Sequence, residues 1–115
     1  MQITRTLALG FVLLSGIAFA HTQLSSSAPA DGATLTTAPE SINLAFSTDV
    51  RLTALSLVDA AGASYELGAL PTATQRAFSI TPARLPAGSY SIGWRAVGAD
   101  THVISGEIHF SIAAN

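Results

Sequence analysis

Short runs of alternating apolar and polar residues fill the chain from residue 42 onward, and turn-forming residues separate them. The apolar members of the clearest runs are Ile42, Leu44 and Phe46; Leu55 and Leu57; Tyr90, Ile92 and Trp94; and Ile108, Phe110 and Ile112. A period of two residues is typical of strands that bury one face. The pattern therefore predicts an all-β domain with Trp94 in its core.

Turn signals recur at short intervals, as in Pro29-Ala30-Asp31-Gly32 and Pro86-Ala87-Gly88. Breaks roughly every 8–12 residues favour a β-sandwich or barrel over alternating strands and helices. About seven strands in one small domain are typical of an immunoglobulin-like Greek key. Only the stretch 69–77 allows a short helix, and Pro71 disfavours it.

The first twenty residues have a different pattern. An apolar run from Leu7 to Ala18 leads into Ala18-Phe19-Ala20, which fits the small-x-small pattern of signal-peptide cleavage. The run is shorter than the roughly 20 apolar residues of a membrane span. We therefore expect a signal peptide at 1–20, cleaved after Ala20, and one mature domain at 21–115. A retained membrane anchor is the alternative.

Charge and sulfur content narrow the function classes. The chain has 5 Lys+Arg against 7 Asp+Glu, and its basic residues are scattered arginines. Without a basic patch, nucleic acid is not expected as a partner. The chain has no cysteine, and its one methionine is Met1. The mature domain would therefore lack disulfides and the sulfur ligands that Cu(I) prefers.

Nitrogen and oxygen donors remain as candidate metal ligands. Cleavage after Ala20 would give His21 a free α-amine beside its imidazole, and an amine with a pKa of about 7.7–8.0 can join a chelate at neutral pH. Asp100 and His102 form a second candidate pair, because residues two apart in an extended segment point to the same side. Together these groups make a set of three nitrogens and one oxygen. Such donors in a tetragonal arrangement favour Cu(II), whereas Zn(II) would accept them in a tetrahedron.

Other candidate chemistry is sparse. His109 faces away from the apolar side of the last run, so we expect a surface histidine. Asp31 is explained by turn formation before Gly32. The chain has no Gly-x-Ser-x-Gly elbow and no glycine-rich phosphate loop. These features do not favour an enzyme.

Several short blocks occur in a characteristic order. They are Ser27-Ala28-Pro29-Ala30-Asp31-Gly32-Ala33, Ala38-Pro39, Ile42-Asn43-Leu44-Ala45-Phe46-Ser47, Leu85-Pro86-Ala87-Gly88-Ser89-Tyr90, Gly93-Trp94-Arg95-Ala96-Val97, Ala99-Asp100-Thr101-His102 and Ser105-Gly106. Together with the histidine after the signal peptide, their order and spacing resemble the CopC family of periplasmic copper-binding proteins, over about residues 21–113. The resemblance implies a seven-stranded Greek-key barrel or sandwich. It also implies a Cu(II) site made from the amine and imidazole of His21 with Asp100 and His102, where the first strand meets the loop at one end of the domain.

We therefore expect a periplasmic protein that sequesters copper or passes it to a partner, such as an inner-membrane copper transporter or another copper protein. We expect it to be a monomer. Two alternatives stay open. One is a metal-free immunoglobulin-like interaction module in which His21 is incidental. The other is a copper-dependent oxidative enzyme, since an N-terminal histidine chelate resembles the copper brace of oxidative polysaccharide-cleaving enzymes.

Three positions depart from the family pattern. Many relatives carry an acidic residue directly after Phe-Ser, where this chain has Thr48, so any auxiliary role of that acid is lost or moves to Asp49. The Met-rich Cu(I) site of some relatives has no counterpart after cleavage. Val103 stands where relatives often have proline, which changes the loop after His102.

Overall fold

The computed structural model describes residues 22–114, and within that range the chain forms six strands and no helix. The strands are β1 (Leu24–Ala28), β2 (Ala33–Leu35), β3 (Ile42–Asp59), β4 (Gln75–Ile80), β5 (Gly88–Gly98) and β6 (Val103–Ile112). Within this range no helix is therefore long and apolar enough to cross a membrane. The prediction of an all-β domain is confirmed.

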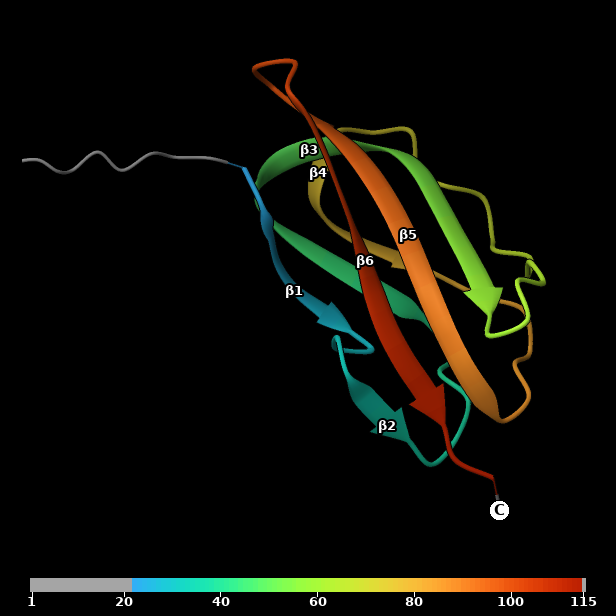
Figure 1. The fold of residues 1–115 in the computed structure, drawn as a ribbon. Coiled ribbons are helices and arrows are strands. Elements are labelled where there is room, and N and C mark those ends of the chain that lie inside the picture. Colours follow the sequence, from blue (N-terminus) through green and yellow to red (C-terminus); the bar gives the residue numbers. More distant parts are fainter. Residues whose placement is uncertain (1–21, 115) are drawn as a thin grey trace, which may run out of the picture.

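One long strand, β3, organises the sheet. The strand order is β1-β3-β5-β6-β2, with β4 also paired to β3. The first part of β3, residues 42–46, lies between β1 and β4, whereas residues 50–59 pair with β5. The register shifts across the intervening bend at residues 47–49. Figure 1 shows how this bend carries β3 around the molecule, so that the sheet curls over a single core.

The bend in β3 explains why residues 22–114 form six strands, whereas the sequence predicted about seven. The alternating runs that begin at Ile42 and Leu55 are two parts of one 18-residue strand. The polar residues between them bend the strand and change its partners without ending it. The sequence pattern shows the two runs but not their continuity.

Strands β5 and β6 hold between them the segment that contains Asp100 and His102. They form an antiparallel pair in regular register, from Gly88 opposite Ile112 to Val97 opposite Val103. Its connection, residues 99–102, projects past the end of the sheet (Figure 1). On its other edge β6 pairs in parallel with β2, which places Ala33 opposite Phe110.

The core contains the apolar residues that the alternation predicted except Leu55, which is partly buried and packs against it. The buried hydrophobic side chains of the core are Ile42, Leu44, Phe46, Val50, Leu52, Leu57, Phe78, Ile80, Leu85, Tyr90, Ile92, Trp94, Ala96, Ile108, Phe110 and Ile112. Trp94 is 9% exposed and meets Phe46 edge to face, with ring centroids 5.4 Å apart, a favoured aromatic geometry. Its indole also lies against Gly106, the residue opposite on β6. Placement of Trp94 in the core is confirmed.

The short helix considered for 69–77 is wrong. No helix occurs there, and Gln75 already begins β4. Gly68 donates a backbone hydrogen bond to the carbonyl of Thr81 at 2.8 Å, and Ala83 donates one to Glu66 at 2.9 Å. These bonds fix the start of the segment in a bridged, extended path, and Pro71 lacks the N–H that a helix would use.

Candidate metal centre

Asp100 and His102 lie in a tight turn between β5 and β6. The N–H of Thr101 donates to the carbonyl of Gly98 at 3.0 Å, and the N–H of Gly98 donates to the carbonyl of His102 at 3.1 Å. Thr101 has a φ of 67°, in the left-handed region that non-glycine residues seldom occupy. The extended geometry assumed from the sequence is therefore wrong, and a turn brings the two side chains together instead.

The Asp100 and His102 side chains contact each other directly. Asp100 Oδ2 lies 2.8 Å from His102 Nδ1, and Asp100 Oδ1 accepts a hydrogen bond from the backbone N–H of His102 at 3.1 Å. Both side chains are open to solvent, with His102 84% and Asp100 60% exposed. The side-chain hydrogen bond from His102, followed by its backbone N–H, lowers the pKa of Asp100 below its ordinary value. The turn therefore presents an ionised carboxylate and an imidazole side by side.

The first described residue, Thr22, lies at this same turn. A Cβ added to Gly98 would stand 3.1 Å from Asp100 Oδ1 and 3.4 Å from Thr22 Oγ1. Thr22 and Asp100 therefore flank the same point of the backbone. The predicted ligand His21 precedes Thr22 in the chain and lies outside the described residues.

The bend of β3 also contacts Thr22 and Gln23, the first two described residues. Thr22 Oγ1 lies 2.8 Å from Thr48 Oγ1. The N–H of Gln23 donates to Ser47 Oγ at 3.0 Å, and the N–H of Ser47 donates to the carbonyl of Gln23 at 2.9 Å. Asp49, considered for an auxiliary role, forms an exposed ion pair with Arg76, with 3.8 Å between Oδ1 and Nε.

The described part of the chain does not complete a metal site. Among residues 22–114, no group of three or more His, Asp or Glu side chains is arranged to hold a metal ion. Asp100 and His102 are two candidate donors within this range. The two further donors that the sequence predicts, the amine and imidazole of His21, lie outside it.

A second histidine cluster was not predicted. His109 is exposed, as expected, but a carboxylate lies near each of its ring nitrogens. Asp31 Oδ1 is 3.4 Å from Nδ1 and accepts the backbone N–H of His109 at 2.8 Å, and Glu107 Oε1 is 3.2 Å from Nε2. Asp31 and His109 are 78 residues apart, and the pairing of β2 with β6 that joins them leaves no local sequence signal.

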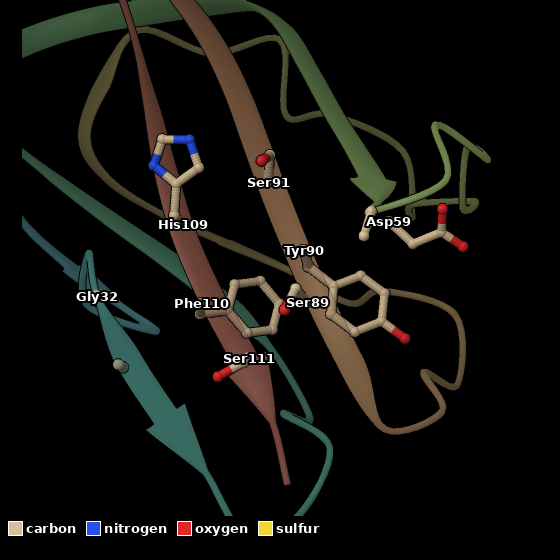
Figure 2. A pocket seen from close by; sticks show the side chains of 10 residues that line it. Gly32, Asp59, Ser89, Tyr90, Ser91, His109, Phe110 and Ser111 are labelled. Atoms are coloured by element: carbon tan, nitrogen blue, oxygen red, sulfur yellow. The ribbon is translucent and has the colours of Figure 1, made fainter.

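His109 borders an open pocket of about 400 Å³ that residues of β5 and β6 line together with Gly32 and Asp59 (Figure 2). Ser91 lies beside it on β5, and Ser111 follows on β6. The carboxylates of Asp31 and Glu107 face different nitrogens of the His109 ring, so they do not converge on one metal position. The cluster ties the turn before β2 to β6.

The hydrogen bond between His109 and Asp31 leads to a prediction about the stability of the protein at acid pH. The backbone N–H of His109 is the main cause of a lowered pKa for Asp31 in the folded protein. Because the folded pKa lies below the ordinary value of 3.8, the contribution of Asp31 is present above about pH 4 and is lost as pH falls through the lowered pKa. The D31N variant should therefore lose less stability on acidification than the wild type. Urea unfolding from about pH 7 to about pH 2 checks this, and parallel curves for the two proteins would contradict it.

A family model described as the CopC domain matches residues 24–113, most of the chain. This protein belongs to the CopC family.

Relatives and solved structures agree with this assignment. The chain is 38% identical over 119 residues to Copper resistance protein C of Pseudomonas syringae pv. tomato, covering 93% of this chain and 92% of the relative. The crystal structure of PcoC, a methionine-rich copper resistance protein from Escherichia coli, is 34% identical with a TM-score of 0.66 and covers 82% of this chain and all of that one. The crystal structure of CopC from Methylosinus trichosporium OB3b has a TM-score of 0.71 at 24% identity, covers 80% of this chain and 93% of that one, and supports the fold. The names of the Pseudomonas syringae and Escherichia coli proteins describe copper resistance proteins, in agreement with the prediction that the chain is not an enzyme.

Proposed function

We propose that this protein is a periplasmic copper-binding protein that holds one Cu(II) ion between the amine and imidazole of His21, the carboxylate of Asp100 and the imidazole of His102. Membership of the CopC family and relatives named for copper resistance support copper as the ion. The observation that supports the site is the turn that holds the Asp100 and His102 side chains in contact with each other. Thr22 lies next to this turn.

The oxidation state follows from the donors that the chain offers. Nitrogen and oxygen ligands suit Cu(II), whereas Cu(I) prefers thiolates and thioethers. The chain has no cysteine, and Met1 belongs to the proposed signal peptide. In this respect it differs from the relative described as methionine rich. Cu(I) carriage through methionine has no candidate ligands in a mature domain of residues 21–115.

Asp100 prepares the site in two ways. Its carboxylate is ionised at neutral pH and needs no deprotonation before binding, and its lowered pKa extends the ionised form to more acidic solution. Its contact with Nδ1 of His102 also fixes the ring, as carboxylates do for metal-binding histidines. Binding and release of copper, without turnover, are the whole of the proposed activity. The protein would act as a monomer that sequesters copper or delivers it to an inner-membrane transporter or another copper protein.

The copper-dependent oxidative enzyme finds no support in the described surface. Trp94, the one tryptophan, is buried, and within residues 22–114 the large hydrophobic side chain that stands exposed is Val103, at 60%. A flat aromatic face for a polysaccharide is therefore absent from this part of the chain. An ionised Asp100 among the ligands would also occupy a position that oxygen needs.

Cu(II) titration of the protein beginning at His21, its mass verified, tests the proposal. We expect one equivalent to bind, with a tetragonal electron paramagnetic resonance spectrum that shows coupling to nitrogen. Zn(II) added in competition should not displace it at equal concentration, because Cu(II) stands above Zn(II) in the divalent affinity order. Absence of binding, or a spectrum without nitrogen coupling, would overturn the proposed site.

A further inference from the structure

The start of the described chain is held in place before it enters a strand. Thr22 and Gln23 precede β1, which begins at Leu24. Chain ends of this kind are poorly ordered unless other contacts fix them. Here three hydrogen bonds do so, one between the hydroxyls of Thr22 and Thr48 and two that join Gln23 to Ser47.

Thr48 makes the contact nearest to the predicted amino terminus. It lies in the exposed bend of β3, between the part that pairs with β1 and the part that pairs with β5. Its hydroxyl meets Thr22 at 2.8 Å. Thr22 Oγ1 also lies beside Gly98, at 3.4 Å from the position of an added Cβ, and Asp100 Oδ1 is at 3.1 Å from the same position. Thr22 is therefore held between the β3 bend and the turn that carries Asp100.

We propose that Thr48 is a positioning residue for the copper site: its hydroxyl holds Thr22 against Gly98 and so sets where the amino terminus meets Asp100 and His102. The inference rests on the proposed function, in which His21 supplies two of the ligands. Thr48 does not touch the ion in this scheme.

Thr48 would act by preorganising the amino terminus. A free amino terminus must lose conformational freedom when it joins a metal site, and this loss opposes binding. A hydrogen bond that already orders the adjoining residue removes part of that loss before the ion arrives. Thr48→Val preserves the shape of the side chain and deletes the hydroxyl, whereas Thr48→Ser preserves the hydroxyl.

The test compares three variants with the wild type. Thr48→Val should weaken Cu(II) binding roughly two- to tenfold, the range of one net hydrogen bond, and Thr48→Ser should restore it. Thr34→Val is the matched control, because Thr34 is also an exposed threonine whose hydroxyl meets another hydroxyl, that of Ser111, but on β2. Thr34→Val should leave the affinity unchanged.

A metal-free measurement accompanies the titration. Amide hydrogen exchange at Gln23 should be faster in the Thr48→Val protein than in the wild type. The urea concentration at the midpoint of unfolding should be nearly the same for the two proteins. If the wild type binds Cu(II) and the Thr48→Val protein binds it equally well, the positioning role is overturned while the copper site stands. If Thr48→Ser loses as much affinity as Thr48→Val, the hydroxyl is not the cause and the inference is also overturned. Failure of the wild type to bind would overturn the proposed function itself.

Discussion

Replacement of His21 by alanine in the mature protein is expected to weaken Cu(II) binding by more than about 100-fold. Loss of a group that only supports a ligand typically costs 10–100-fold in metal affinity, and this change removes a ligand itself. The amine would remain, but it would no longer belong to a chelate with the imidazole of the same residue. Cu(II) titration in the presence of a competing chelator measures the loss.

Addition of one residue before His21 separates the amine from the imidazole in a second way. The imidazole remains, but the former amine becomes a peptide nitrogen with no basic lone pair. We expect a loss of the same order as for His21→Ala. The matched control is His109→Ala, since His109 is an exposed histidine outside the proposed site, and its loss should not change the affinity. Unchanged stoichiometric binding by the extended protein would remove His21 from the site.

Replacement of Gly106 by alanine is expected to destabilise the fold by about 1–3 kcal/mol, the usual cost of overpacking a core. A Cβ at Gly106 would stand 2.8 Å from Cζ2 of Trp94 and 3.0 Å from two further indole atoms. The indole is buried and packs against Phe46, so it cannot move aside without disturbing that contact. Urea unfolding followed by Trp94 fluorescence reports both the stability and the environment of the ring.

Gly93→Ala provides the control for Gly106→Ala. Gly93 lies on the neighbouring strand β5, opposite Glu107, and an added Cβ there would stand 2.9 Å from Ser56 Oγ. A serine hydroxyl can rotate away at little cost, whereas a buried indole cannot. We therefore expect Gly93→Ala to change stability much less. Equal effects of the two substitutions would show that the indole contact is not the cause.

The sequence predicts the core better than it predicts the chain path. Alternation identifies Ile42, Phe46 and Ile108 as inward-facing, because a buried strand face must be apolar wherever the strand lies. The path of β3 depends on which strands pair with each part of it, and residues 47–49 are polar in either case. A turn between two strands and a bend within one strand therefore look alike in the sequence.

For the candidate site, too, the sequence predicted the residues better than it predicted the path of the chain. Residue chemistry identified Asp100 and His102 as a pair, and the structure places them in contact. The segment is nevertheless not the extended one that the sequence pattern predicted, because a left-handed residue, Thr101, folds it into a turn. The Asp31–His109 contact could not be predicted, since it depends on strands far apart in the sequence. Local chemistry can be read from sequence, whereas the contacts that tertiary pairing creates cannot.

The parallel pairing of β2 with β6 has a consequence for the order of events in folding. It joins Thr34 to Ser111, partners that are 77 residues apart. Contacts between such distant segments slow folding, because a long loop must close before the pairing stabilises it. The sheet cannot be completed until the last strand has been synthesised. A chain that has not yet added β6 therefore lacks this pairing and stays incompletely folded.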